Sequence, residues 1–223
     1  MDLDGDGKDD LVSGSWPGGI YLFPGTGKGK FGERRTLIEK APLPDDHRYK
    51  QYGYTRYQAG ALAAADWDGD GDVDLLCGTT FDTLYLFENE GSAKKPSFGE
   101  PVVLLDGKSS GVPNFRRQGP CVADWDGDGD LDLIAGTETA GVHLFRNTGT
   151  RKEPKLAKAE ELLPGGKPWR KGYRAKVFVT DFDGDGAPDL LIGNCEYEEK
   201  KPRGTLHGYV YLCLRKKPAP KEE

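Results

Sequence analysis

Short apolar runs separated by polar turns recur along the whole chain. Runs such as Ile20–Phe23, Leu84–Phe87 and Val142–Phe145 are four residues long, rich in β-branched, leucine and aromatic residues, and separated by turns that contain Gly, Pro, Asp or Asn. Runs of this length and composition predict β-strands, and no apolar stripe with a 3.6-residue period indicates a helix. The pattern therefore predicts an all-β protein.

The same order of runs returns four times. In a complete unit, one apolar run precedes an acidic stretch, a second follows it directly, and two more come after short turns. The acidic stretches begin at residues 2, 66, 124 and 181, so a unit is about 60 residues long. A four-stranded antiparallel unit of this length predicts the blade of a β-propeller. We expect one array over residues 1–215, with units of about 1–40, 41–106, 107–164 and 165–215, and a disordered polar tail at 216–223.

The first and the last unit are each one strand short. No apolar run precedes Asp2, and no fourth run follows Cys213. The four units therefore either close a small ring with two partial blades or form an arc of a larger propeller. Because Met1 stands directly before the first acidic stretch, we expect the chain to be a piece of a longer protein.

Every acidic stretch has carboxylates at positions 1, 3, 5 and 9 and glycine at positions 4 and 6. Like charges this close repel by roughly 1–3 kcal/mol per pair, so a cation between them is favoured over a solvated acidic turn. The glycines permit the positive φ that a tightly curled loop requires. Oxygen ligands without His or Cys select a hard cation, and Ca²⁺ accepts six to eight of them. The sequence thus predicts three to four structural Ca²⁺ ions.

Position 7 differs among the four copies, as expected if only its backbone carbonyl binds the ion. The predicted ligands are Asp2, Asp4, Asp6, Lys8 and Asp10; Asp66, Asp68, Asp70, Asp72 and Asp74; Asp124, Asp126, Asp128, Asp130 and Asp132; and Asp181, Asp183, Asp185, Ala187 and Asp189. An EF-hand fits badly, because its twelfth position should be a bidentate Glu and here it is Ser13, Cys77, Ala135 or Ile192.

The run Asp-x-Asp-Gly-Asp-Gly-x-x-Asp-Leu, with the tyrosine- or valine-containing strand that follows it, resembles the FG-GAP/VCBS repeat of integrin α-subunit propellers and many bacterial secreted proteins. The resemblance covers nearly the whole chain. It implies a propeller, usually seven-bladed, with Ca²⁺ in the loops between the first two strands of each blade. It also implies a secreted, periplasmic or cell-surface protein with an adhesion or ligand-binding role. The chain departs from the family in blade number, because only four units are visible.

Composition and charge narrow the classes of protein and of partner that remain. With 36 % hydrophobic residues, 32 Gly and 15 Pro, the chain is rich in turns. The formal charge of −6 lies in the metal motifs, and four Ca²⁺ ions would reverse it to +2. No stretch reaches the roughly 20 apolar residues of a membrane span. We expect no nucleic-acid partner either, because the basic residues are not part of a basic domain.

The connections on the face opposite the acidic loops share aromatic and basic residues that the fold does not require. Flat rings stack on sugar faces or peptide side chains, and Arg binds carboxylates, so we expect a glycan or protein ligand. The alternative is that these residues pack between blades. The predicted ligand-binding residues are Trp16, Tyr52, Tyr54, Arg56, Tyr57, Phe115, Arg116, Arg117, Trp169, Arg170, Tyr173 and Arg174.

Catalysis finds little support. The histidines are His47, His143 and His207, and the chain has no nucleophile elbow, zinc motif or phosphate loop. We therefore expect a calcium-binding adhesion or ligand-binding scaffold and no enzyme. The alternatives are a carbohydrate-active enzyme of the polysaccharide lyase or hydrolase type, its accessory domain, or a structural spacer. The four cysteines are read as small core residues, with a disulfide as the alternative.

Overall fold

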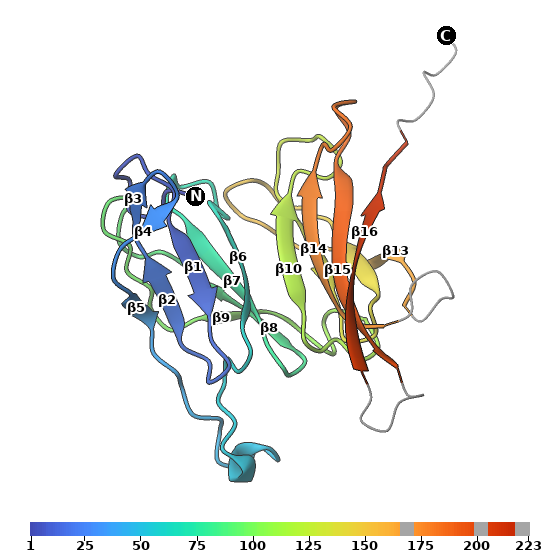
Figure 1. The fold of residues 1–223 in the computed structure, drawn as a ribbon, viewed down its shortest axis with the longest axis horizontal. Helices are drawn as coiled ribbons and strands as arrows, with labels where there is room; N and C mark the ends of the chain where they lie inside the picture. The colour runs from blue at the N-terminus through green and yellow to red at the C-terminus, as the bar shows by residue number, and fades with distance from the viewer. Residues whose placement is uncertain (166–171, 199–204, 217–223) are drawn as a thin grey trace.

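The computed structural model describes residues 1–165, 172–198 and 205–216 (Figure 1). Regular structure in this part of the chain is β-strand, except for the short 3-10 helix η1 (Lys50–Tyr52). The predicted all-β architecture is confirmed. The predicted ligand-binding residues Trp169 and Arg170, and residues 217–223 of the predicted tail, lie outside the described residues.

The strands form four antiparallel sheets, which we call blades 1 to 4. Blade 1 contains β1 (Leu11–Gly14), β2 (Ile20–Phe23) and β5 (Arg35–Ile38), with a small hairpin of β3 (Gly25–Gly27) and β4 (Lys30–Phe31). Blade 2 contains β6 (Ala61–Ala65), β7 (Asp74–Gly78), β8 (Thr83–Phe87) and β9 (Val102–Asp106). The strands follow one another in the sheet as they do in the sequence.

Blades 3 and 4 repeat this up-and-down order. Blade 3 contains β10 (Gly119–Ala123), β11 (Asp132–Gly136), β12 (Val142–Phe145) and β13 (Glu160–Leu163). Blade 4 contains β14 (Tyr173–Thr180), β15 (Asp189–Glu198) and β16 (Thr205–Cys213). Among the described residues, blade 1 lacks the first strand and blade 4 lacks the fourth, as the apolar runs predicted.

The two faces of a sheet are buried in two different cores. In blade 2, Leu76 pairs with Leu86, and Leu75 pairs with Phe87. Leu76 and Leu86 belong to the core shared with blade 3, whereas Leu75 and Phe87 belong to the core shared with blade 1. Because side chains alternate along a strand, each apolar run supplies both interfaces. A third core joins blades 3 and 4.

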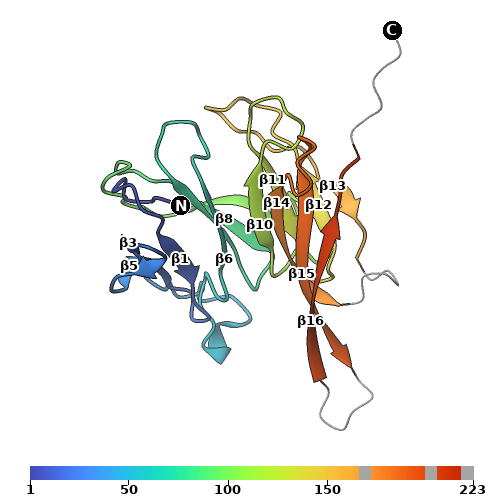
Figure 2. The ribbon, with the colours of Figure 1, turned by 45° about the horizontal axis from the view of Figure 1, so that its top comes forward.

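Consecutive blades meet along their first strands. β6 contacts β10, and β10 contacts β14, while β1 of the incomplete first blade contacts β6. In both views β1 and β16 lie on opposite sides of the molecule (Figures 1 and 2). The chain thus builds its blades one after another around a common axis.

A glycine at the end of each second strand lets the next blade come close. A Cβ atom on Gly14, Gly78 or Gly136 would lie 2.2, 2.4 or 2.3 Å from a backbone carbonyl oxygen of the following blade. No side chain can occupy these positions without moving a strand. All four cysteines are free thiols, so the disulfide alternative is not realised. No helix within the described ranges is long and apolar enough to cross a membrane.

Candidate metal loops and ligand face

The acidic stretches form four loops, each joining the place of a first strand to a second strand. We call residues 2–10, 66–74, 124–132 and 181–189 metal loops 1 to 4. All eight glycines at positions 4 and 6 have positive φ, between 67° and 97°. Residues with a Cβ rarely adopt this conformation, so the glycines explain why the loops curl tightly. The predicted loop geometry is present in every copy.

Each loop brings three carboxylates within 4.8 Å of one another. In loops 1 and 2 these are positions 1, 3 and 5, whereas in loops 3 and 4 they are positions 1, 3 and 9. The clusters are Asp2, Asp4 and Asp6; Asp66, Asp68 and Asp70; Asp124, Asp126 and Asp132; and Asp181, Asp183 and Asp189. Four acidic clusters can therefore hold metal ions. Position 7 belongs to none of the clusters, and its carbonyl remains a predicted ligand.

The donor set of these loops fits Ca²⁺. The carboxylate oxygens Asp4 Oδ1 and Asp66 Oδ1 are buried and accept no hydrogen bond. A buried charged oxygen without a partner is costly, and a cation bound between the carboxylates would satisfy it. All clustered donors are carboxylate oxygens, which is the chemistry that hard divalent cations prefer.

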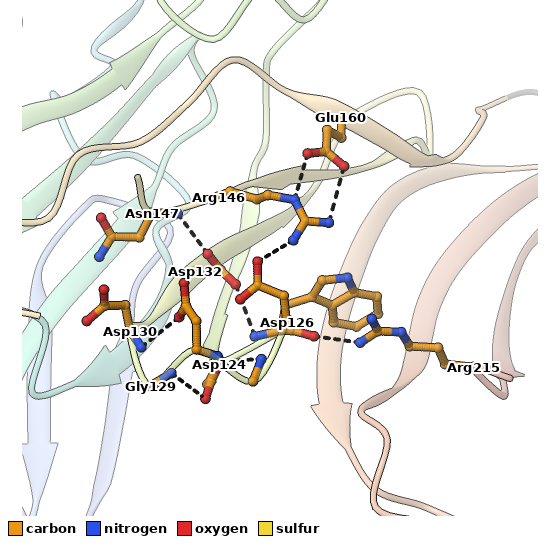
Figure 3. A network of polar contacts seen from close by, with 12 residues as sticks. Asp124, Asp126, Gly129, Asp130, Asp132, Arg146, Asn147, Glu160 and Arg215 are labelled. Carbon is orange, nitrogen blue, oxygen red and sulfur yellow. Dashed lines mark hydrogen bonds and ion pairs between the residues drawn. The ribbon is translucent and has the colours of Figure 1, made fainter. Parts of the chain in front are cut away.

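The Asp at position 9 also has a structural role that the sequence did not reveal. In loop 3 its Oδ2 accepts the N–H of Trp125 at 3.0 Å, and its Oδ1 accepts the N–H of Asn147 at 2.7 Å (Figure 3). The same two hydrogen bonds occur in the other three loops, at 2.9 Å for the first and 2.6 to 2.8 Å for the second. Asp132 and its equivalents thus fasten each loop to the end of the third strand.

An asparagine after the third strand completes this arrangement in blades 2 and 3. Asn89 Oδ1 accepts the N–H groups of Gly91 and Ser97 at 3.1 and 2.9 Å, and Asn147 Oδ1 accepts two equivalent N–H groups. The repeated glycine of this turn was visible in the sequence. The asparagine was missed, because its role depends on a hydrogen bond from its own N–H to the metal loop.

The environments of the position-9 carboxylates differ. Burial raises the pKa of Asp74 to about 6 and also raises the pKa of Asp132. For Asp189, hydrogen bonds from the N–H groups of Arg215 and Phe182 lower the pKa. Asp189 is itself fully shielded, with 0 % exposure against 3 % for Asp74, but it lies beside the uncovered outer face of blade 4. We attribute the opposite pKa shifts of Asp74 and Asp189 to this missing cover. With less protein around Asp189, its hydrogen bonds outweigh the effect of burial on its pKa.

Basic side chains reach three of the loops. Arg146 pairs with Asp126 of loop 3, and its Nε lies 2.7 Å from Glu160 Oε1 (Figure 3). Arg151 of blade 3 lies 3.3 Å from Asp66 in loop 2. In loop 1, Lys8 Nζ lies 2.6 Å from Asp6 Oδ2, where a bound ion would compete with it. No sequence pattern pointed to Arg146 and Arg151, because both lie well outside the acidic motifs.

The opposite end of the molecule carries the predicted ligand-binding residues. The metal loops begin beyond the arrowheads of β10 and β14, whereas η1 lies at the other end (Figure 1). Tyr57 and Phe115 are only 2 % and 1 % exposed and belong to the interblade cores. Tyr57 and Phe115 therefore pack between blades, which was the alternative to ligand binding. Arg56 lies over the Tyr57 ring at 5.9 Å and pairs with Glu100.

Tyr52 and Tyr54, two of the predicted ligand-binding residues, lie on a segment that packs on blade 2. Tyr54 and its neighbour Tyr49 both contact the ring of Phe81, at centroid distances of 6.1 and 5.6 Å. Tyr52 on the same segment is 68 % exposed. A cavity of about 430 Å³ opens here, lined in part by His47, Tyr49, Phe81 and Asp82 and bounded by Arg116.

Four other residues gather near the carboxylate of Glu138, and we call Trp16, Arg117, Glu138, Tyr173 and Arg174 the Glu138 cluster. Arg117 Nε lies 2.8 Å from Glu138 Oε2, and Arg174 Nε lies 3.8 Å from Glu138 Oε1. The Arg117 guanidinium lies 6.0 Å from the Trp16 ring. Residues from blades 1, 3 and 4 and from the connection between blades 2 and 3 meet here. Glu138 itself was missed, because only the fold brings it between the two arginines.

Two further cavities adjoin this cluster. One of about 510 Å³ and one of about 310 Å³ share Glu138 and Tyr173 in their walls. The larger also shares Arg116 with the 430 Å³ cavity on blade 2. The three cavities are therefore neighbours, linked by shared wall residues across blades 2, 3 and 4. We call this surface the ligand face.

Comparisons with known proteins agree with this architecture. A family described as the FG-GAP-like repeat matches residues 2–77, 66–135 and 124–192. Integrin alpha pat-2 of Caenorhabditis briggsae is 30% identical over 216 residues, covering 86% of this chain and 17% of the relative. Cartilage acidic protein 1 is 27% identical in both Mus musculus and Homo sapiens, covering 84% of this chain and 27% or 26% of the relative.

A solved structure shows the same fold. The structure of an Agrocybe aegerita lectin, described as recognising non-reducing terminal N-acetylglucosamine, matches with a TM-score of 0.50 and 19% identity. The match covers 95% of this chain and 50% of the lectin chain. The chain spans between 17% and 27% of the length of the curated relatives named above. On the evidence of the three matching segments, this chain belongs to the FG-GAP-like repeat family.

Proposed function

We propose that the protein is a calcium-stabilised β-propeller scaffold that works outside the cytosol and binds a glycan on its ligand face. The observation that carries this proposal is the chemical difference between the two ends of the molecule. One end has four clusters of three carboxylates. The other has three neighbouring cavities whose walls contain arginines and aromatic rings, among them the exposed ring of Tyr173.

The role proposed for Ca²⁺ is structural. Each loop joins two strands of a blade, and its position-9 Asp holds the end of the third strand. In loop 2, Gly69 lies against the side chain of Arg151, so the next blade packs on the loop itself. An ion would therefore stabilise both a blade and a blade interface, and its removal would leave carboxylates to repel one another. Extracellular modules hold Ca²⁺ with dissociation constants of about 10⁻⁴–10⁻³ M, which supports a location outside the cytosol.

The ligand face fits a glycan better than it fits the flat surface of a protein partner. Trp16 and Tyr173 are 59 % and 50 % exposed and offer ring faces on which sugars stack. The cavities of about 310 to 510 Å³ are of the size of small ligand sites. The Agrocybe aegerita lectin indicates that this fold can carry a glycan site, although the low identity transfers no residue roles.

Binding without turnover is part of the proposal. His47 is the one histidine among the described residues that line the three cavities. The carboxyl group of Glu138 is paired with Arg117 and Arg174, so its oxygens are already engaged by the protein. Reversible binding with unchanged glycan products, checked by mass spectrometry, would support a scaffold, whereas turnover would indicate an enzyme.

The direct test is a glycan array probed with the Ca²⁺-loaded protein and three variants. We expect Trp16→Ala and Tyr173→Ala to weaken binding at least tenfold, because stacking on an aromatic ring is lost. Phe31→Ala is the matched control, since Phe31 is also exposed, at 46 %, but lies on β4 of the small hairpin. No bound glycan, or equal binding by all three variants, would contradict the proposed ligand face.

A further inference from the structure

The connections between blades share a backbone feature that the sequence did not reveal. Each has a non-glycine residue with left-handed φ: Ala59 at 57°, Arg117 at 51° and Arg174 at 61°. The carbonyl of the following residue lies against the close-approach glycine of the preceding blade. The blade junction therefore requires the left-handed conformation, and glycine would adopt it with the least strain.

Two of these three strained positions are occupied by arginine. At the first junction Ala59 has no side chain that reaches a partner. At the second and third junctions, the side chains of Arg117 and Arg174 converge on Glu138. Strain at a position where glycine would fit indicates that the side chain itself is used. The two arginines are therefore candidates for a binding function.

Backbone contacts fix Glu138 between the arginines. The Glu138 N–H donates to the carbonyl of Arg116 at 2.8 Å, and the Arg174 N–H donates to the carbonyl of Glu138 at 3.0 Å. Arg117 and Arg174 thus flank a single carboxylate, whereas the Arg116 guanidinium donates to the carbonyl of Thr80 at 3.4 Å. Two guanidinium groups and one carboxylate leave one positive charge uncompensated.

The surplus charge is local and contrasts with the rest of the chain, whose formal charge is −6. Lys176 adds to it, because its ammonium donates to the carbonyls of Arg117 and Gln118 at 3.2 and 3.0 Å. Arg174 lines the cavity of about 310 Å³ next to Glu138, and Arg116 lines the one of about 510 Å³. A ligand that enters either cavity meets an arginine and the exposed ring of Tyr173.

We propose that the ligand face binds an acidic glycan, with Arg117 and Arg174 binding the carboxylate of a uronic acid residue. Guanidinium groups bind carboxylates through paired hydrogen bonds, and Glu138 holds the two guanidinium groups in place as a positioning residue. The neighbouring cavities suit a linear polymer with a repeating unit. This inference rests on the proposed glycan-binding function and adds the chemical class of the glycan.

An acidic peptide would present the same carboxylate, but the observations favour a sugar. The Trp16 ring lies 6.0 Å from the Arg117 guanidinium, and Tyr173 lines the same cavity as Arg174, so flat apolar surfaces lie beside the charge. Sugar rings next to a uronic acid would stack on such surfaces. The peptide enters the test as a competing probe.

The experiment measures binding of a panel of uronate oligosaccharides, each paired with its carboxyl-reduced form, by calorimetry with Ca²⁺ present. We expect at least one acidic oligosaccharide to bind at least tenfold more tightly than its reduced partner. Higher salt should weaken this preference, because it depends on charge. If no acidic oligosaccharide of the panel binds more tightly than its carboxyl-reduced form, the inference is wrong. If a hexaglutamate peptide binds more tightly than every sugar, the inference is also wrong.

Substitution by glycine separates binding from folding. Arg117→Gly and Arg174→Gly remove the guanidinium but relieve the backbone strain, so we expect at least tenfold weaker binding without a lower melting temperature. Ala59→Gly relieves the same strain at the first junction and should leave binding unchanged. Full affinity in both arginine variants would overturn the inference. A neutral glycan that needs Trp16 but not the arginines would overturn it while the proposed function stands.

Discussion

Blades 2 and 4 carry the same apolar positions but differ in what covers them. Leu84 and Leu86 of β8 are 0 % and 3 % exposed, whereas Val210 and Leu212, in the same places on β16, are 76 % and 41 % exposed. The register supports the equivalence, because Leu84 pairs with Gly78 as Val210 pairs with Gly193. Blade 3 covers these side chains of blade 2, and no described residue covers those of blade 4.

The metal loops show the same contrast. At position 2, Trp67 of loop 2 is 3 % exposed, and Phe182 of loop 4 is 58 % exposed. A Cβ on Gly69 would lie 2.7 Å from Arg151, whereas a Cβ on Gly184 would meet nothing within 4 Å. Each repeat thus supplies apolar side chains for both faces of its blade. How deeply a metal loop is buried depends on the blade that follows it.

The largest expected effect comes from truncating the same leucine in both blades. We expect Leu86→Ala to lower the free energy of unfolding by about 3 kcal/mol, because it opens a cavity in a closed core. Leu212→Ala should cost less than about 1 kcal/mol, since its site is open to water. Urea unfolding of the two variants measures the difference. Equal losses would show that the outer face of blade 4 is buried in solution.

The close-approach glycines give the next effect. A Cβ on Gly78 would lie 2.4 Å from the carbonyl oxygen of Gln118, but one on Gly193 would meet nothing within 4 Å. We expect Gly78→Ala to destabilise the protein by about 2 kcal/mol through forced strand movement. Gly193→Ala should change stability by no more than about 0.5 kcal/mol. A tolerated Gly78→Ala variant, judged by the same unfolding assay, would contradict the blade packing described above.

The position-9 carboxylates allow a test by pH in EGTA. The raised pKa of Asp74, about 6, means that the folded state holds a proton that the unfolded state has released, so stability falls as pH rises from about 4 to 6. The lowered pKa of Asp189 has the opposite sign, and its contribution is lost as pH falls below about 4. We expect Asp74→Asn to flatten the first slope, by on the order of 1–2 kcal/mol, and Asp189→Asn to affect only the acid limb. Identical pH profiles of the two variants would contradict the difference in environment.

Local residue patterns predicted the strands and the metal loops because both depend on neighbours in sequence. Alternating apolar runs determine the faces of a sheet, and glycine at positions 4 and 6 determines the curl of a loop. The position-9 Asp was predicted only as a metal ligand, because its hydrogen bond to Asn147 spans 15 residues. No local sequence pattern links two residues that far apart in the chain.

The ligand face was predicted less completely, because exposure depends on tertiary packing. Tyr57, Phe115, Tyr52 and Trp16 are all aromatic, yet the first two are buried and the last two are exposed. Composition cannot separate these cases. Glu138 was missed for a related reason, since its partner Arg117 comes from the connection before β10 and its partner Arg174 from β14.

The central claim is that the four acidic loops are structural Ca²⁺ sites. Thermal unfolding in excess Ca²⁺ and in excess EGTA, with bound calcium counted in the same sample, tests it most directly. We predict three or four bound ions and a melting temperature at least about 10 °C higher with Ca²⁺, because each occupied site adds binding free energy to the folded state alone. Asp68→Ala should lower the count by one. An unchanged melting temperature with no bound ion would contradict the claim.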